Sequence, residues 1–286
     1  MKTNYLLVLF ALLLAIPQAA DAKKKKDIAI QLYSVRDIIN NGTDLNVVLK
    51  NLAQMGYTSI EAANYDNGKF YGKTPEEFKN AVEKAGMKVL SSHCSRGLSD
   101  KEVASGDFSE SLKWWDQSIA AHKAAGMKYI VNPGIGVPKT MKEMKMYCDY
   151  FNTVGYKTAA ASIAFGYHNH AFEFRKIGDQ LIYDFLLHNV SPNHVFFEMD
   201  VYWVQEGGGD PVAYLKNRPS QFKAVHIKDE KEIGASGKMN FKPIFDQMYA
   251  NNIKDWYVEV EQYTQNDPVA SVQQSYDYLN KADYVK

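Results

Sequence analysis

The chain repeats one local pattern, in which a helical stretch ends in glycine and a short apolar run follows at once. It occurs as Gln54-Met55-Gly56-Tyr57-Thr58-Ser59-Ile60-Glu61, Lys84-Ala85-Gly86-Met87-Lys88-Val89-Leu90 and Ala124-Ala125-Gly126-Met127-Lys128-Tyr129-Ile130-Val131. Glycine suits the left-handed residue that closes a helix. A short run that is apolar on both faces is typical of a strand in a parallel sheet. The repeat therefore predicts helices and parallel strands in alternation.

Eight such runs can be placed along the chain, with room for a helix in every gap and after the last run. The predicted strands are Asp27–Tyr33, Thr58–Ala62, Lys88–His93, Tyr129–Asn132, Ala164–His170, Val195–Asp200, Ala224–Lys228 and Trp256–Glu261. Eight strand–helix units in about 250 residues indicate an α/β fold, a single (β/α)8 TIM barrel. The alternative is a doubly wound open sheet, which usually has a glycine-rich turn after its first strand. This chain has Ser34-Val35-Arg36-Asp37 there.

Residues 1–22 have the features of a secretory signal peptide. Lys2 is followed by an apolar core from Leu6 to Ile16 and by the small-residue pattern Ala20-Asp21-Ala22. The apolar core is shorter than the roughly 20 residues of a membrane span. We therefore expect cleavage, a mature barrel of residues 23–286, no membrane span after processing, and a location in the periplasm or cell envelope. An uncleaved anchor is the alternative.

The charge balance argues against a polyanionic partner. Lys plus Arg and Asp plus Glu both number 33, so the formal net charge is zero. No long-range field then favours nucleic acid or an anionic membrane, and a small neutral substrate fits better. The two cysteines, Cys94 and Cys148, are predicted at a strand end and inside a helix, so we expect free, mostly buried thiols. A monomer and a homo-oligomer both remain open.

Polar side chains gather where the predicted strands end, which is where barrel enzymes carry their active sites. Four of the seven histidines lie there. The residues concerned are Gln31, Tyr33 and Arg36; Glu61; Ser92 and His93; Asn132; His168, Asn169 and His170; Glu198 and Asp200; His226, Lys228 and Asp229; and Glu259 and Glu261.

This concentration of carboxylates and imidazoles predicts a divalent cation. Burying such groups together costs several kcal/mol unless something compensates their charge. Mixed carboxylate and imidazole ligands suit Mn, Fe, Co or Zn better than Ca. The alternative is a hydrogen-bonded polar cluster around Lys228 without a metal.

Four segments together resemble the xylose isomerase-like barrel superfamily, often called sugar phosphate isomerase/epimerase. They are Tyr167-His168-Asn169-His170-Ala171-Phe172-Glu173-Phe174, Glu198-Met199-Asp200-Val201-Tyr202-Trp203-Val204, Val225-His226-Ile227-Lys228-Asp229 and Val258-Glu259-Val260-Glu261-Gln262. The resemblance spans nearly the whole mature chain. It implies a TIM barrel and a metal set of Glu, Asp, His and Glu on strands five to eight.

The resemblance assigns Asp200 and His226 directly as metal ligands. On strand eight, Glu259 and Glu261 share the same parity, and we expect Glu261 to be the ligand because it is nearer the carboxyl end. On strand five, His168 occupies the usual glutamate position, so either His168 is a ligand or Glu173 reaches in from the loop. A second histidine favours Zn or Co over Mg or Mn, and we expect a divalent ion that is Zn, Mn or Co rather than Mg.

The resemblance also implies chemistry by proton abstraction next to a carbonyl, as in isomerases, epimerases and keto-sugar lyases. We expect a non-phosphorylated sugar or keto-glycoside, with Glu259 or Glu173 as proton shuttle and His93 and Lys228 holding or polarising the substrate. Two alternatives remain: a metallo-endonuclease-like hydrolase, and a non-catalytic sugar-binding barrel. The expected substrate contacts are Gln31, Tyr33, Glu61, Asn132, His170 and Trp203.

Overall fold

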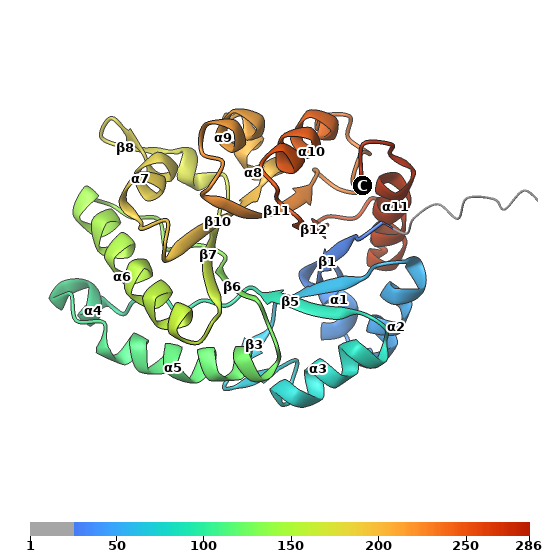
Figure 1. Cartoon of the computed structure of the whole chain (residues 1–286), viewed down its shortest axis with the longest axis horizontal. Coiled ribbons are helices and arrows are strands. Elements are labelled where there is room, and N and C mark those ends of the chain that lie inside the picture. The colour runs from blue at the N-terminus through green and yellow to red at the C-terminus, as the bar shows by residue number, and fades with distance from the viewer. Residues whose placement is uncertain (1–25) are drawn as a thin grey trace, which may run out of the picture.

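The predicted strands form one parallel sheet that closes on itself, with helices around its outside (Figure 1). The computed structural model describes residues 26–286, so the predicted signal peptide lies outside the described residues. The barrel strands are β1 (Ala29–Gln31), β2 (Ser59–Ala62), β5 (Lys88–Ser92), β6 (Tyr129–Asn132), β7 (Ala164–His168), β10 (Val195–Asp200), β11 (Phe222–Lys228) and β12 (Asp255–Glu259). Their order is β5-β2-β1-β12-β11-β10-β7-β6, which confirms the TIM-barrel prediction.

The ring closes between β5 and β6. His93 and Val131 form a parallel bridge, and the amide of Cys94 donates to the carbonyl of Val131 at 2.8 Å. Lower down, the amide of Lys128 donates to the carbonyl of Leu90 at 2.8 Å. His93 therefore belongs both to this seam and to the carboxyl ends of the strands.

Helices fill the connections between the barrel strands. They are α1 (Arg36–Asn40), α2 (Leu45–Met55), α3 (Pro75–Lys84), α4 (Asp100–Ser105), α5 (Ser109–Ala124), α6 (Met141–Ala160), α7 (Ile182–Asn189), α8 (Val201–Glu206), α9 (Pro211–Asn217), α10 (Phe241–Ala250) and α11 (Pro268–Lys281), with short 3-10 turns η1 (Leu32–Val35) and η2 (Phe172–Phe174). None of these helices is long and apolar enough to cross a membrane.

The glycine in the repeat ends its helix as predicted. Gly56, Gly86 and Gly126 have φ values of 119°, 86° and 76°, a region that L side chains rarely adopt. After Gly86, the amide of Met87 donates back to the carbonyl of Val82 at 3.1 Å. This bond satisfies a carbonyl of the last helical turn and directs the chain into β5.

Two small hairpins stand in the loops after β2 and β7 and were not predicted. They are β3 (Tyr65–Asp66) with β4 (Lys69–Phe70), and β8 (Lys176–Ile177) with β9 (Gln180–Leu181). The first turns through Asn67-Gly68, both with positive φ, which is a strong hairpin signal in a sequence.

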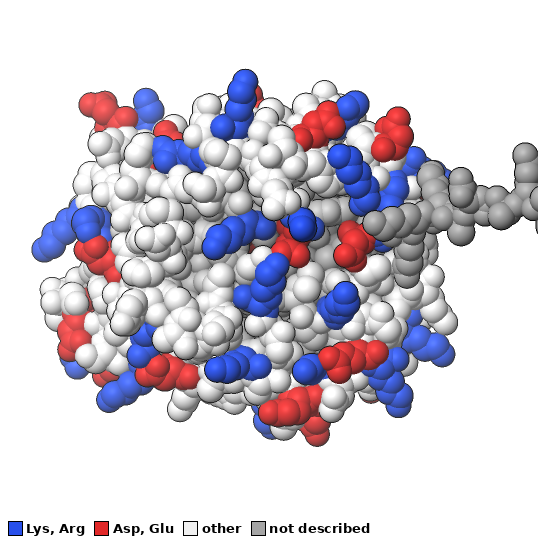
Figure 2. All heavy atoms as spheres, in the orientation of Figure 1, with Lys and Arg blue, Asp and Glu red and all other residues white. Residues whose placement is uncertain are grey.

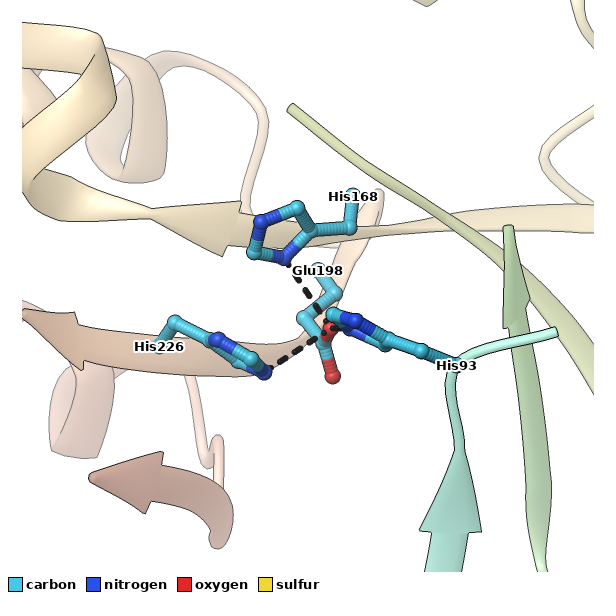
Figure 3. Close-up of side chains that lie close together, drawn as sticks. All are labelled: His93, His168, Glu198 and His226. Carbon is cyan, nitrogen blue, oxygen red and sulfur yellow. Dashed lines mark hydrogen bonds and ion pairs between the residues drawn. The ribbon is translucent and has the colours of Figure 1, made fainter. Parts of the chain in front are cut away.

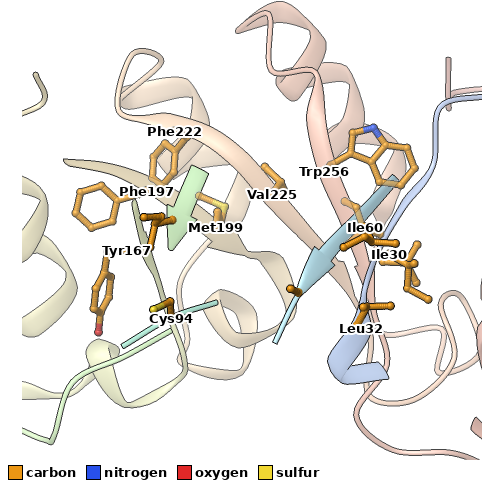
Figure 4. Packing of buried hydrophobic residues seen from close by; sticks show 14 of the residues in the cluster. Ile30, Leu32, Ile60, Cys94, Tyr167, Phe197, Met199, Phe222, Val225 and Trp256 are labelled. Carbon is orange, nitrogen blue, oxygen red and sulfur yellow. The ribbon is translucent and has the colours of Figure 1, made fainter. Parts of the chain in front are cut away.

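The strands bury apolar side chains on their outer face, against the helices. Figure 4 shows this layer, in which Ile30, Ile60, Phe197, Met199 and Val225 are fully buried. The barrel interior is different. Its lower part is a separate apolar cluster of Ala29, Tyr129, Val131, Phe196, Ala224 and Tyr257.

Along the strands, the side chains that point into the barrel change from apolar to polar toward the carboxyl ends. On β10 the sequence Phe196, Glu198, Asp200 climbs one inner row, and on β11 Ala224 is followed by His226 and Lys228. The apolar lower cluster thus forms the floor on which the polar group at the carboxyl ends rests.

Candidate metal centre

Five strands bring histidine and acidic side chains together above the apolar floor. Two overlapping groups have ligand atoms that all lie within 4.8 Å of one another. One is His93, His168, Glu198 and His226, and the other is His168, Asp200, His226 and Glu259. All these side chains are buried except His93, which is 10% exposed.

The first group is centred on Glu198, a residue to which the sequence analysis gave no role. Its Oε2 atom lies 2.8 Å from Nε2 of His93, 3.2 Å from Nδ1 of His168 and 3.1 Å from Nε2 of His226 (Figure 3). The sequence alone could have indicated this place for Glu198, because it lies two residues before Asp200 on β10 and residues two apart on a strand face the same side.

In the second group, Asp200 keeps one oxygen free. Its Oδ1 caps α8 by accepting the amide of Trp203 at 2.9 Å, while the buried Oδ2 accepts no hydrogen bond. Burial raises the pKa of Asp200 to about 8. Asn169 holds the Asp200 backbone: its Oδ1 accepts the Asp200 amide at 3.1 Å.

The remaining members of the second group face Asp200 from the neighbouring strands. Nε2 of His168 lies 3.9 Å from the free Oδ2 of Asp200, and Nδ1 of His226 lies 3.2 Å from Oε2 of Glu259. Two imidazoles and two carboxylates, one of which has a buried oxygen without a hydrogen bond, are a donor set that fits a divalent transition metal.

Burial and charge oppose each other throughout this cluster. Burial alone would lower the pKa of His226, but Glu198 and Glu259 raise it well above its usual value. Burial would raise the pKa of Glu259, but Lys228 and His226 lower it well below its usual value. The site is therefore a region of closely balanced buried charge, which is where functional groups concentrate.

The two strand-eight glutamates take different places. β12 ends at Glu259, because the next amide, that of Val260, donates to Oγ of Ser34 at 3.0 Å. Glu261 lies beyond the strand, with its side chain 28% exposed and its Oε1 atom 3.0 Å from Nζ of Lys228. The structure thus groups Glu259, and not the expected Glu261, with Asp200 and His226.

Glu173 does not reach into the cluster. Its Oε1 accepts the hydroxyl of Tyr167 at 2.6 Å and its Oε2 accepts the amide of His170 at 2.8 Å. Burial raises the pKa of Glu173 to about 8. Both oxygens are thus used to fold the loop after β7.

Several expected substrate contacts serve other partners. Gln31 donates to Oε2 of Glu61 at 2.7 Å, and the same Glu61 oxygen lies 2.7 Å from Nε2 of His226. Asn132 follows the inward-facing Val131, and its Oδ1 accepts the amide of Gly134 at 3.0 Å. Gln31 and Asn132 thus have partners within the protein, and Glu61 contacts the histidine through one oxygen while its Oε1 atom is buried without a hydrogen bond.

Other expected contacts surround the mouth. The ring of Trp203 lies 6.0 Å from that of His170, and Nζ of Lys228 lies 5.6 Å from the Trp203 ring centroid. Tyr33 is 42% exposed, beside the guanidinium of Arg36. Aromatic faces next to hydrogen-bonding groups are suited to a polyol.

Comparisons with known proteins identify the family to which this chain belongs. The model of the xylose isomerase-like TIM barrel family matches residues 49–282, and the chain belongs to that family. Two crystal structures of sugar phosphate isomerase/epimerase proteins from Parabacteroides distasonis are similar over almost the whole chain. One is 36% identical with a TM-score of 0.84, covering 91% of this chain and 100% of that one. The other is 32% identical with the same TM-score, covering 93% and 98%.

More distant relatives are sugar-modifying enzymes. The inosose dehydratase of Lactiplantibacillus plantarum is 26% identical over 167 residues, which span 50% of this chain and 55% of that enzyme's length. The 3-keto-D-glucoside 4-epimerase of E. coli shares the fold, with a TM-score of 0.66 at 20% identity over 90% of this chain and 100% of that one. The family and its neighbours thus include epimerases and dehydratases that act on sugars.

Proposed function

We propose that this chain is a divalent-metal enzyme that removes a proton next to a carbonyl of a non-phosphorylated sugar or keto-glycoside. The observation that carries this proposal is the convergence of His168, Asp200, His226 and Glu259 from four strands, with Oδ2 of Asp200 buried and unbonded. These four residues would hold the ion. The two imidazoles favour Zn or Co over Mg or Mn.

A bound divalent ion would polarise the substrate carbonyl and stabilise the negative charge that follows proton removal. Lys228 stands beside this group, 3.5 Å from Oε2 of Glu259 and 3.0 Å from Oε1 of Glu261. Burial would lower the pKa of Lys228, but Glu259, Asp200 and Glu261 raise it above its usual value. Lys228 therefore remains protonated and would hold a substrate oxygen rather than act as a base.

We assign to Glu261 the role of the base that accepts the proton from the substrate. Glu259 is buried among the ligands, and both oxygens of Glu173 are committed to Tyr167 and His170. Glu261 is partly exposed at the mouth and is paired with Lys228, which would orient its carboxylate toward a bound sugar. The roles expected for Glu259 and Glu261 from the sequence are thereby exchanged.

The charge around the centre supports a neutral substrate. Lys228 lies beside the described cluster, and two carboxylates already lie within 3.5 Å of its Nζ atom. On the face drawn in Figure 2, basic and acidic side chains lie near one another, and the formal net charge of zero gives no long-range field that would favour a polyanion. A sugar with a carbonyl fits better than a phosphodiester.

An isomerase or epimerase returns the abstracted proton to carbon, whereas a lyase expels a neighbouring group. Both outcomes begin with the same step at the same residues. We propose the isomerase or epimerase first, and the keto-glycoside lyase as the second candidate. The family resemblance to a 3-keto-glucoside epimerase and an inosose dehydratase supports this substrate class.

The test combines metal analysis with proton exchange from solvent into 3-keto sugars. Wild type is expected to hold one ion per chain and to exchange the proton next to the carbonyl. Asp200→Asn and His226→Ala should lose both the ion and exchange, whereas Glu261→Gln should keep the ion and lose exchange. Glu230→Gln, in the loop after β11, is the control. Full exchange in metal-free wild type would contradict the proposed metal dependence. Full exchange in Glu261→Gln would contradict the assignment of Glu261 as the base.

A further inference from the structure

Two of the clustered histidines face acidic groups on both sides. His168 has Nδ1 3.2 Å from Oε2 of Glu198, and Nε2 3.9 Å from Oδ2 of Asp200. His226 has Nε2 3.1 Å from Oε2 of Glu198, and Nδ1 3.2 Å from Oε2 of Glu259. Each ring thus presents one nitrogen to Glu198 and the other to Asp200 or Glu259.

A histidine that binds a metal ion is neutral, with one N–H and one lone pair, and a carboxylate only accepts hydrogen bonds. For His168 the two distances differ enough to place the proton. The contact of 3.2 Å with Glu198 is within hydrogen-bond range, whereas 3.9 Å to Asp200 is not. The proton of His168 therefore lies on Nδ1, and its Nε2 lone pair faces Asp200.

In His226 the two nitrogens are exchanged: Nε2 faces Glu198 and Nδ1 faces the side of the ion. Its Nε2 atom lies 2.7 Å from Oε2 of Glu61 as well as 3.1 Å from Glu198, so two carboxylates compete for a proton at that nitrogen. Nδ1 faces only Glu259 among these carboxylates, at 3.2 Å. A proton on Nε2 leaves the Nδ1 lone pair directed at the side where Glu259 lies.

We propose that Glu198 is a positioning residue that fixes the tautomer of His168 and, together with Glu61, that of His226, and so directs the ion to the side of Asp200 and Glu259. This inference rests on the proposed metal-dependent function. The two overlapping groups then have different roles. The group that contains Asp200 and Glu259 binds the ion, and Glu198 in the other group holds the histidines in the orientation that the ion needs. His93 completes the support by placing Nε2 2.8 Å from Glu198.

Carboxylates that orient a ligating histidine contribute strongly to metal affinity, and their loss typically weakens it 10- to 100-fold. Here one oxygen serves three imidazoles, and Glu198 is fully buried. Replacing this carboxylate by an amide keeps the size of the side chain but adds an N–H that opposes the histidine protons. We therefore expect the upper part of that range for Glu198→Gln.

The experiment measures Zn²⁺ affinity and stoichiometry with purified full chain, for wild type, Glu198→Gln and Glu102→Gln. Glu102 is the matched control: its carboxylate is also buried, but it accepts from Ser99 and Ser111 at the periphery. Wild type and Glu102→Gln should bind one ion equally well, and Glu198→Gln should bind one ion 10- to 100-fold more weakly. Affinity within twofold of wild type in Glu198→Gln would overturn the inference.

A second measurement needs no variant. In Zn²⁺-loaded wild type with ¹⁵N-labelled histidine, NMR should show one histidine bound through Nε2 with a proton on Nδ1, and another bound through Nδ1 with a proton on Nε2. Two histidines bound through the same type of nitrogen would refute the proposed tautomers. Two ions per wild-type chain would also refute the inference, because Glu198 would then be a ligand. Absence of any bound ion in wild type would instead overturn the proposed function.

Discussion

Glu232 offers a direct test of how the loops around the mouth are held together. It lies in the loop after β11, is 2% exposed, and accepts three hydrogen bonds. The donors are the amide of Thr264 at 2.9 Å, the hydroxyl of Thr264 at 2.6 Å and the hydroxyl of Ser271 at 2.6 Å. Glu232 thus connects the loop after β11 to the loop after β12 and the start of α11.

The effect of pH follows from the same contacts. Burial alone would raise the pKa of Glu232, but the hydrogen bonds from Ser271 and Thr264 lower it from 4.5 to about 2. A lowered folded-state pKa adds stability that is complete above pH 4.5 and is lost as the pH falls toward 2. At 1.36 kcal/mol per pKa unit, this contribution is about 3 kcal/mol at pH 7 and about 1 kcal/mol at pH 3.

The assay is urea unfolding of wild type and Glu232→Gln at both pH values. Glu232→Gln should be less stable at pH 7, and the difference in unfolding free energy from wild type should shrink by about 2 kcal/mol at pH 3. Glu230→Gln removes an exposed partner of Lys238 in the same loop and should leave the free energy of unfolding unchanged at both pH values. A difference that is the same at pH 3 and pH 7 would refute the assigned role of Glu232.

Three further predictions concern packing, metal and processing. Gly155→Ala should destabilise the protein by about 1–3 kcal/mol in urea unfolding, because the new Cβ would lie 2.3 Å from the carbonyl oxygen of His194. Gly97→Ala, with open space around the new Cβ, should leave stability unchanged, and equal stabilities of the two variants would contradict the prediction. Zn²⁺ at 100 times its Kd should raise the unfolding free energy by about 2.7 kcal/mol in wild type but not in Asp200→Asn, so a similar increase in both proteins would count against the site. Amino-terminal sequencing of the cell-envelope protein should begin near Lys23, and a cytoplasmic product that starts at Met1 would exclude export.

The parts of the fold that local rules determine could be predicted from the sequence. The glycine after each repeat has the required positive φ, and each apolar run that follows is a barrel strand. Asp200 and His226 were placed at strand ends by the same reasoning, and they lie together because their strands are neighbours, with Asp200 paired to His226.

The remaining features depend on long-range contacts. The sequence shows that Glu259 and Glu261 share a parity, but β12 ends between them because Ser34, 226 residues away, takes the Val260 amide. Likewise, nothing local distinguishes Glu198 from Asp200 on one inner row. Their different surroundings arise from histidines on other strands, whose height in the barrel is set by strand pairing.

Closure of the barrel has a mechanical consequence. One bridge, His93 with Val131, joins β5 to β6, whereas β10 and β11 share four paired residues. The side chain of the same His93 reaches Glu198 at the centre of the cluster. The imidazole thus connects the end of β5 to β10 across the ring, so separation of β5 from β6 would displace a hydrogen-bond partner of Glu198. Any opening of the barrel at this seam would therefore change the surroundings of Glu198 in the proposed metal centre.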